Sequence, residues 1–398
     1  MGKISFRLLH HAPPENIAWL AGCVGADSGR LADLCRRENR EIAVVYGEGC
    51  QFKLIAGAAA GSEIEVLIAV RGEGEYRPSA LMLGSRSQFE QLASCLTAIE
   101  ETLGGQISLS LGQGAPGKWA IGGGRELALD RTLIMGVLNL TPDSFYAGSR
   151  VGAVDEALRR AAAMAEEGAD IIDLGGESTR PGAEEVPAAE EIARVVPVVK
   201  AVSTELGNIP VSIDTYKSDV AAAALDAGAS IVNDIGAGLL DEAMPDVVAG
   251  AGAGYVMMHM RGKPRTMQSD TAYVDMMGEI HRFFVSGLER CESAGIEPER
   301  IVLDPGIGFG KPPEGNYEII ARLGEFGSLG RPLLIGASRK SFLALAGQDD
   351  PAERLEGSLA ACVVAVLAGA RIVRVHDVGP ARRAVAAAGV FASKTGRI

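Results

Sequence analysis

The sequence predicts an α/β protein in which a TIM (β/α)8 barrel follows a small α+β N-terminal domain. Three observations support this prediction: the length of the chain, a change of pattern near residue 104, and a regular alternation of short apolar runs with amphipathic segments after residue 131. With 398 residues the chain exceeds one typical domain, so one large domain and one smaller domain are expected.

The composition is that of an ordinary globular protein, with 47% apolar and 22% charged residues. A net charge of −13 argues against nucleic-acid binding through a general basic surface. The six cysteines show no CxxC or Cys/His spacing, which indicates reduced thiols of an intracellular protein. No signal peptide and no apolar stretch of membrane-spanning length is found. We therefore expect a cytoplasmic protein with neither nucleic acid nor membrane as a partner.

Residues 1–104 combine strand-like runs at 42–47 and 64–70 with a helical pattern at 87–104, which predicts a small α+β domain of unknown role. The next residues, 105–126, are rich in glycine and predict a hairpin or linker with few contacts across it. A GxGxxG match at 112–117 follows a strand-like ISLSL, but no helix is predicted after it. We therefore do not expect a dinucleotide site there.

The third region, residues 127–398, contains eight short apolar runs with helical segments such as 153–168 and 187–207 between them. The runs cover 133–139, 170–177, 210–214, 230–234, 255–260, 301–304, 332–338 and 371–377. Their starts are about 34 residues apart on average, the size of one βα unit. Eight such units close into a barrel of roughly 250 residues. A doubly wound open sheet remains the alternative, because periodicity alone does not show closure.

Polar residues end these runs, and the carboxyl ends of barrel strands are where barrel enzymes carry their chemistry. They are Asn139, Glu177, Asp214, Asn233, Asp234, Asp304, Ser338, Arg374, His376 and Asp377. Any one of them could simply cap a helix or form hydrogen bonds within the core. Their convergence on one end of the barrel nevertheless indicates a functional site. Five cations follow the strands as well: Arg180, Lys311, Arg339, Lys340 and Arg374. Together with helix N-termini they predict a phosphate-bearing substrate, with the loops 139–152 and 175–187 as lids.

Eight segments at these strand ends carry a family resemblance. They are IMGVLNLTPDSF (134–145), DLGGESTRPGA (173–183), PVSIDTYKSDV (210–220), IVNDI (231–235), MMHMRGKPRTMQ (257–268), LDPGIGFGK (303–311), IGASRKSF (335–342) and RVHDV (374–378). In this order they resemble the dihydropteroate synthase family of folate biosynthesis. The resemblance implies a TIM barrel that condenses 7,8-dihydropterin-6-ylmethyl diphosphate with 4-aminobenzoate, giving 7,8-dihydropteroate and diphosphate.

The resemblance also implies roles for single residues. The pterin pocket would be formed by Asp214, Asn233, Met258, Asp304 and Lys340. The diphosphate would lie against Asn139, Arg374 and His376, with Asn139 as the protein ligand of Mg²⁺. The 4-aminobenzoate would be received by Thr179, Arg180, Pro181, Phe309 and Ser338. Asp214, Lys340 and Arg374 would be the catalytic residues, and the family implies a homodimer.

The sequence departs from the family at one loop and over the N-terminal region. Tyr146-Ala147-Gly148-Ser149 stands where the family usually has Ser-Asp-Gly-Gly, so Ala147 replaces the loop acid. About 120 N-terminal residues lie outside the resemblance. Two other functions therefore stay open: a pterin-binding relative that uses another acceptor, such as a methanopterin-type aniline or a corrinoid, and a pterin-binding paralogue without turnover.

Overall fold

The computed structural model describes residues 5–9, 14–24, 26–37, 41–46, 55, 58–59, 61–68, 80–98, 101–111, 116–140, 150–179, 183–344 and 350–394. The chain forms two compact units. The first comprises Met1–Ala115 together with two later segments, Tyr273–Val285 and Arg322–Gly330. The second comprises Pro116–Ala272, Ser286–Ala321 and Arg331–Ile398.

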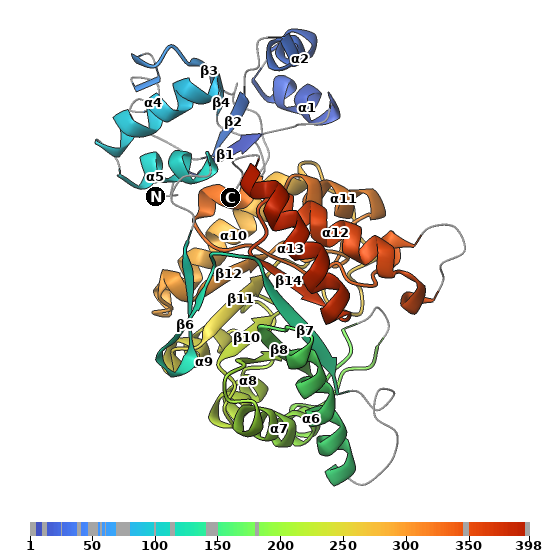
Figure 1. The fold of residues 1–398 in the computed structure, drawn as a ribbon. Coiled ribbons are helices and arrows are strands. Elements are labelled where there is room, and N and C mark those ends of the chain that lie inside the picture. The colour runs from blue at the N-terminus through green and yellow to red at the C-terminus, as the bar shows by residue number, and fades with distance from the viewer. Residues whose placement is uncertain are drawn as a thin grey trace. The chain divides into compact units, whose positions relative to one another are not determined.

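The first unit is built on a four-stranded antiparallel sheet in the order β1-β2-β4-β3 (Figure 1). Its strands are β1 (Ser5–Leu9), β2 (Glu41–Tyr46), β3 (Glu65–Ile68) and β4 (Ala80–Gly84). Its helices include α1 (Pro14–Val24), α2 (Ser28–Arg37), α4 (Arg86–Thr97) and α5 (Glu101–Ser110). Both faces of the sheet are covered: Ile42 and Val44 of β2 belong to one apolar cluster with α1 and α2, and Ala43 and Val45 to another with α4 and α5. This two-sided burial explains why the strand is apolar throughout rather than alternating.

A buried ion-pair network joins the sheet of the first unit to the two later segments of the chain. Arg7 of β1 is 1% exposed, and its Nη2 donates to Tyr46 Oη and to Asp275 Oδ2, both at 2.9 Å. Its Nη1 donates to Glu325 Oε2 at 3.2 Å. Asp275 immediately precedes α10 (Met276–Ser293), and Glu325 lies in the short helix η3 (Leu323–Leu329). The expectation of few contacts between the N-terminal region and the later chain was therefore wrong.

The glycine-rich region also differs from the expectation. Ile107 and Leu111 of the strand-like ISLSL pack into one core cluster from helix α5 and its end, because residues four apart lie on one helix face. The hairpin of β5 (Lys118–Ile121) and β6 (Arg125–Ala128) is packed into the second unit rather than free. Trp119 is fully buried, and its Nε1 donates to the carbonyl of Arg300 at 2.8 Å. The expected boundaries at 104 and 126 thus lie inside α5 and β6, and the two units separate between residues 115 and 116.

The second unit is a closed parallel barrel, which confirms the predicted fold class. Its strands are β7 (Leu133–Asn139), β8 (Ile171–Gly175), β9 (Val211–Asp214), β10 (Ile231–Asp234), β11 (Gly254–Met258), β12 (Ile301–Asp304), β13 (Leu334–Ile335) and β14 (Ile372–Val375). They are paired in the order β12-β11-β10-β9-β8-β7-β14-β13. A parallel bridge between Leu303 and Leu333 connects β12 to the start of β13, so the sheet closes and the open-sheet alternative is excluded.

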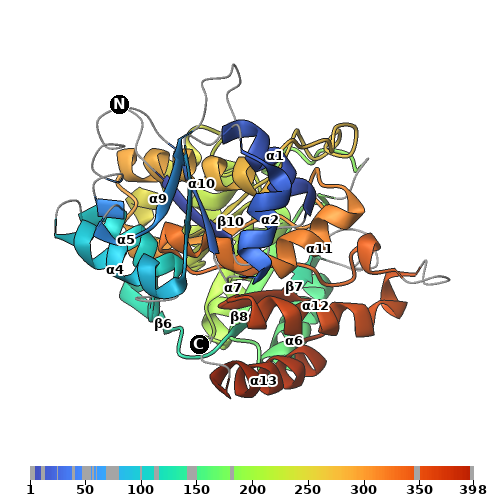
Figure 2. The same cartoon turned by 90° about the horizontal axis from the view of Figure 1, so that it is seen from above.

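Helices follow the barrel strands and lie outside them (Figure 2). They are α6 (Arg150–Glu166), α7 (Ala188–Glu205), α8 (Ser218–Asp226), α9 (Met244–Ala251), α10, α11 (Pro313–Ala321), α12 (Leu355–Leu367) and α13 (Val378–Lys394). Short 3₁₀ turns occur at η1 (Gly122–Gly124), η2 (Pro298–Arg300), η3, η4 (Ser341–Leu343) and η5 (Pro351–Glu353). Among the described helices, none combines the length and the apolar character needed to cross a membrane.

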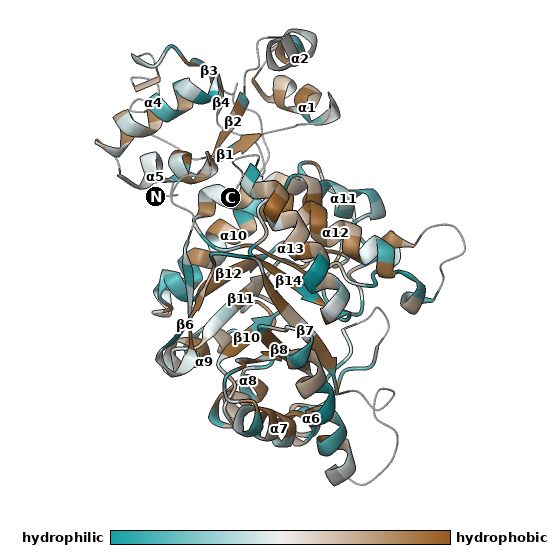
Figure 3. Ribbon diagram, viewed as in Figure 1, coloured by the Kyte–Doolittle hydropathy of each residue, from teal (hydrophilic) through white to brown (hydrophobic). Residues whose placement is uncertain are grey.

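The barrel interior changes from apolar to polar along the strands, and this change positions the site. Strands are brown, hence apolar, over much of their length in Figure 3. Ile171, Ile231, Val256, Val302 and Ile372 form one cluster with Trp119 of the hairpin. Two residues further along the same strands come Asp173, Asn233, Met258, Asp304 and Arg374. Since side chains two apart in a strand share a face, these groups lie directly above the apolar layer, toward the carboxyl ends.

Candidate active site

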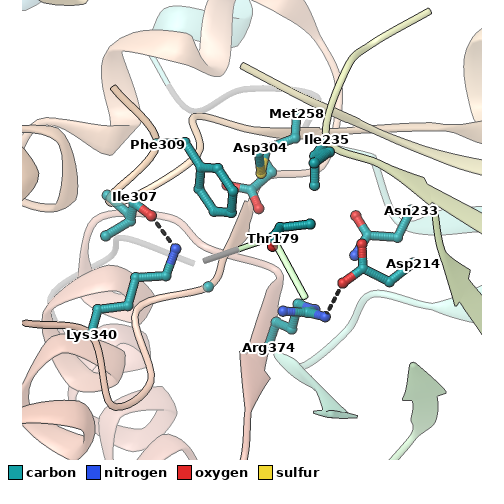
Figure 4. Close-up of a pocket in the computed structure, with 11 residues that line it drawn as sticks. Thr179, Asp214, Asn233, Ile235, Met258, Asp304, Ile307, Phe309, Lys340 and Arg374 are labelled. Atoms are coloured by element: carbon teal, nitrogen blue, oxygen red, sulfur yellow. Dashed lines mark hydrogen bonds and ion pairs between the residues drawn. The ribbon is translucent and has the colours of Figure 1, made fainter. Parts of the chain in front are cut away.

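One pocket opens at the carboxyl ends of the barrel strands (Figure 4). It is lined by Thr179, Asp214, Asn233, Ile235, Met258, Asp304, Ile307, Phe309, Gly336, Lys340 and Arg374. Eight of these residues were predicted from the sequence, and they come from loops and strands spread over residues 179–374. The barrel therefore brings together the whole predicted pterin set together with Thr179, Phe309 and Arg374.

Arg374 lies between two carboxylates at one wall of the pocket. Its Nε donates to Asp173 Oδ2 at 2.6 Å and its Nη2 donates to Asp214 Oδ2 at 2.5 Å. Burial works against the guanidinium charge, but the two carboxylates hold the pKa of Arg374 above its ordinary value. Arg374 thus stays charged in the pocket and is already engaged by protein groups.

Asp214 is the carboxylate with the most altered acidity in the pocket. Burial raises its pKa to about 7, and the negative charges of Asp173 and Glu191 act in the same direction. Arg374 and, more weakly, Lys340 oppose this rise. A carboxylate that titrates near neutrality within a pocket is typical of functional sites.

Lys340 lies on the opposite side of the pocket, together with Ile307 and Phe309 (Figure 4). Its Nζ donates to the carbonyl of Ile307 and lies 4.2 Å from the centre of the Phe309 ring. Burial lowers the pKa of Lys340 to about 8, although the nearby Asp304 favours its charged form. Asp304 Oδ1 accepts from the backbone N–H of Gly306 at 2.7 Å, and burial raises the pKa of Asp304.

This arrangement suits a flat, polar ring. Asp214, Asn233 and Asp304 offer hydrogen-bond acceptors, while Lys340 offers a donor for a carbonyl oxygen. Met258, Ile235, Ile307 and Phe309 supply apolar surface for the ring faces. A few convergent polar groups in an apolar concavity are what a small-molecule site requires.

Three of the predicted residues that the structure describes, Asn139, Ser338 and His376, do not line this pocket. His376 Nδ1 lies 3.1 Å from Ser338 Oγ, and the backbone N–H of His376 donates to the same oxygen at 3.2 Å. Asn139 is the last residue of β7 and pairs in register with Gly175 of β8. Gly175 in turn pairs with Asp214 of β9. Arg180 and Pro181, and Ala147 with its loop, lie outside the described residues.

Two of the five cations expected at the strand ends, Lys311 and Arg339, do not line the pocket. Lys311 is 2% exposed, and its Nζ lies 2.9 Å from His259 Nδ1 and 3.0 Å from the carbonyl of Phe309. Burial lowers its pKa well below the ordinary value, and it does not line the pocket. Arg339 is held by both oxygens of Asp377, at 2.9 and 2.6 Å. Lys340 and Arg374 are the expected cations that reach the pocket among those described.

Glu177, expected at the end of the second barrel strand, is also placed elsewhere. Its carboxylate pairs with Lys217, which in turn contacts Glu191 Oε2 at 2.7 Å. The carboxylate of this strand that contacts a pocket residue lies four residues earlier, at Asp173, which is fully buried and accepts from Arg374. The sequence pattern did not single it out, because Asp173 lies inside the strand rather than at its end. A single charged residue inside the otherwise apolar strand at 171–175 was the available signal.

Comparisons with known proteins agree with this geometry. The model of a family described as pterin binding enzyme matches residues 135–376. A dihydropteroate synthase of Synechocystis is 47% identical over 249 residues, which are 62% of this chain and 86% of that protein. The Escherichia coli dihydropteroate synthase is 45% identical over 255 residues, 64% of this chain and 90% of the relative.

Solved structures give the same result. The Yersinia pestis dihydropteroate synthase in a sulfonamide drug complex is 42% identical with a TM-score of 0.64, covering 68% of this chain and 98% of that one. The Xanthomonas albilineans dihydropteroate synthase with 4-aminobenzoic acid is 40% identical, with a TM-score of 0.64 and coverage of 69% and 98%.

Proposed function

The chain belongs to the dihydropteroate synthase family of pterin-binding enzymes, and from this premise we propose the reaction and its residue roles. The enzyme condenses 7,8-dihydropterin-6-ylmethyl diphosphate with 4-aminobenzoate in the cytoplasm, giving 7,8-dihydropteroate and diphosphate. The observation that carries the proposal is the convergence of Asp214, Asn233, Asp304, Lys340 and Arg374 on one pocket. Relatives whose structures contain 4-aminobenzoic acid or 7,8-dihydropteroate support the two substrates.

The pocket side chains would bind and orient the pterin ring. Asp304, Asn233 and Asp214 accept from its N–H groups, while Lys340 donates to its carbonyl oxygen. Each of these protein groups is buried or nearly so, and a buried polar group without a partner costs about 1–3 kcal/mol. Loss of one of these side chains would therefore leave its partner on the bound ring unpaired.

The reaction would then proceed by charge stabilisation without a protein nucleophile. The bond between the pterin methylene carbon and the diphosphate oxygen breaks, and its electron pair leaves with the diphosphate toward Arg374. The positive charge that develops on the pterin methylene lies near the Asp214 carboxylate, which stabilises it. The amine of 4-aminobenzoate attacks this carbon and loses a proton. Thr179 and Phe309, which line the same pocket, would receive the second substrate.

A Mg²⁺ ion carried by the diphosphate fits the donor set near this pocket. The described residues contain no group of three or more His, Cys, Asp or Glu side chains that could hold a metal on their own. Mg²⁺ commonly uses one or two protein ligands together with substrate phosphates, and the Asn139 amide oxygen at the end of β7 would be such a ligand. When bound, the ion would neutralise charge on the leaving diphosphate. Asn139→Ala should raise the Mg²⁺ concentration needed for half-maximal rate, whereas an unchanged requirement would contradict this role.

A homodimer is also part of the proposal. Val364 of α12 and Val390 and Phe391 of α13 are 44%, 62% and 67% exposed, an unusual degree for large apolar side chains on two adjacent helices. Phe391→Lys should convert a dimer, measured by light scattering, into a monomer. Val274→Lys, at a 65% exposed apolar position outside these helices, is the matched control.

A diphosphate-release assay tests the function. Purified enzyme with pterin diphosphate and Mg²⁺ should release diphosphate only when 4-aminobenzoate is added. Release with a ribosyl aniline but not with 4-aminobenzoate would assign another acceptor. No release with either amine, despite measurable pterin binding, would instead identify a binding protein.

A further inference from the structure

Asp173 is a buried charge that begins one of the family segments but has no role in the predicted site or in the proposed reaction. It lies inside β8 and is fully buried. One carboxylate oxygen, Oδ2, accepts from Arg374 Nε at 2.6 Å and from Asn233 Nδ2 at 3.2 Å. The other oxygen, Oδ1, is buried and has no hydrogen-bond partner among the described residues.

Stability alone does not account for a carboxylate at this position. The residues that pair with Asp173 in register on the two neighbouring strands are Val137 and Ser212, neither of them charged. Burying a carboxylate with one oxygen unsatisfied is costly, and an apolar side chain of similar size would avoid the cost. The charge of Asp173 therefore matters for the two side chains that its Oδ2 binds, Arg374 and Asn233. Both of these side chains line the pocket.

The geometry of the contact divides the guanidinium into two parts. Asp173 holds Arg374 by Nε, the nitrogen next to the aliphatic stem, and leaves both terminal nitrogens for other partners. One of these, Nη2, contacts Asp214 at 2.5 Å. In the proposed reaction Asp214 accepts from the pterin ring and Arg374 binds the diphosphate, so the position of this guanidinium affects both parts of the substrate.

We propose that Asp173 is a positioning residue that holds Arg374 by its Nε, so that the terminal nitrogens of the guanidinium stay where they can bind the diphosphate. The inference rests on the proposed function for the identity of the anion. Because the guanidinium is planar, the stem and the direction of the Nε–H bond together fix the positions of both terminal nitrogens. The Arg374 guanidinium is then preorganised to bind the diphosphate, because few of its rotamers remain accessible.

A double-mutant cycle tests whether Asp173 acts through Arg374. Asp173→Asn keeps the shape of the side chain but removes its charge, and it should lower kcat by about tenfold or more in the wild-type background. In the Arg374→Ala background the same substitution should change kcat less than about twofold, because the group that Asp173 positions is gone. Equal losses in both backgrounds, or no loss in the wild type, would overturn the proposal.

The cycle has a matched control and a second readout. Ser212→Ala removes a fully buried polar group that pairs in register with Asp173 and whose Oγ has no partner among the described residues. It should change kcat less than about twofold. The affinity of every variant for the pterin diphosphate is also measured by calorimetry. The coupling between Asp173 and Arg374 can then be determined even where turnover is too low to measure. Wild-type enzyme without turnover would refute the proposed reaction, while the binding cycle would still decide the role of Asp173.

A substitution at Arg374 itself tests the contact between its Nε and Asp173 without altering Asp173. Lysine keeps the positive charge but has one nitrogen, which cannot bind Asp173 and reach the diphosphate together. Arg374→Lys should therefore lose nearly as much kcat as Arg374→Ala. Retention of most of the activity by the lysine variant would show that charge alone suffices and would overturn the proposal.

Discussion

Two arginines of this protein each bridge two carboxylates, Arg7 in the first unit and Arg374 in the barrel. Arg7 is 1% exposed, and Glu325, one of its carboxylates, is also paired with Arg322 Nε at 2.6 Å. The Arg374 side chain is 21% exposed and lines a pocket. The same ion-pair chemistry thus occurs in a buried cluster around Arg7, the closed cluster, and at the pocket that Arg374 lines, the open site.

The partner carboxylates show what this difference means. Burial acts to raise the pKa of Asp275, but Arg7, the Gly278 N–H and the Tyr46 hydroxyl together hold it below its ordinary value. Burial raises the pKa of Asp214 to about 7, and Arg374 only partly offsets the rise. A carboxylate with all its partners supplied by the protein stabilises the fold. Asp214, whose burial Arg374 only partly offsets and which lines a pocket, is accessible to a ligand.

Removing the whole first unit should have the largest effect. Deleting residues 1–115 takes Arg7 and Tyr46 away from Asp275 and Glu325, and it uncovers the two later segments that complete this unit. Buried Asp275 would lose Arg7, Glu325 would keep only Arg322, and apolar surface would be exposed. We expect an insoluble or unfolded product, assessed by circular dichroism and gel filtration. A soluble barrel with a cooperative unfolding transition would show that the later segments fold without the N-terminal region.

A single substitution in the closed cluster should have the next largest effect. Arg7→Met removes the arginine paired with Asp275 and leaves Glu325 with Arg322 alone, and breaking a buried pair in this way costs about 3–5 kcal/mol. Urea unfolding should show this loss, while kcat of the protein that remains folded stays unchanged. Arg131→Met is the control, because its ion pair with Asp170 is 46% exposed on the arginine side and should contribute at most about 1 kcal/mol. Similar losses in both variants would remove the distinction between the closed cluster and an ordinary surface pair.

Substitutions in the open site should affect binding rather than folding. Asp304→Asn and Lys340→Ala each leave a group of the pterin ring without its partner, which costs about 1–3 kcal/mol of affinity. Calorimetry with the pterin diphosphate measures this loss, and urea unfolding measures stability in parallel. Unchanged affinity in both variants would contradict the pterin pocket.

The sequence predicted the barrel and most of its site for one physical reason. Strands of a parallel barrel end on the same side, so polar residues at their ends converge whatever their distance along the chain. This reasoning placed Asp214, Asn233, Asp304 and Lys340 correctly in one pocket. The outcome did not depend on knowing any side-chain conformation.

Burial and long-range pairing were beyond the same reasoning. Lys311 and Lys340 both follow a strand within a few residues, yet one packs against His259 beneath the loops and the other lines the pocket. Arg7 meets Glu325 across 318 positions of sequence, a separation at which no periodic pattern carries information. Asp173 was missed because its role depends on the direction of Arg374, which only the folded barrel determines.

The smallest effect we predict is a shift in the pH dependence of the open site. The proposed reaction needs Asp214 ionised and Lys340 protonated, and burial raises the pKa of Asp214 to about 7 and lowers that of Lys340 to about 8. The profile of kcat/KM should therefore be bell-shaped, with its acid limb set by Asp214 and its alkaline limb by Lys340. Because the folded-state pKa of Asp214 exceeds its ordinary value, the same group should also make the protein less stable as pH rises from 3.8 to about 7.

Arg374→Gln sharpens this prediction, since the charge of Arg374 lowers the pKa of both groups. Without it the Asp214 carboxyl should ionise at higher pH, and the Lys340 ammonium should lose its proton at higher pH. Both limbs of the kcat/KM profile should then move in the same direction, toward alkaline pH, while the maximum falls. The Arg7→Met variant should keep the wild-type limbs, because its charge belongs to the closed cluster. If Arg374→Gln lowered the maximum but left both limbs in place, Arg374 would act on the substrate alone, and the electrostatic coupling within the pocket would be refuted.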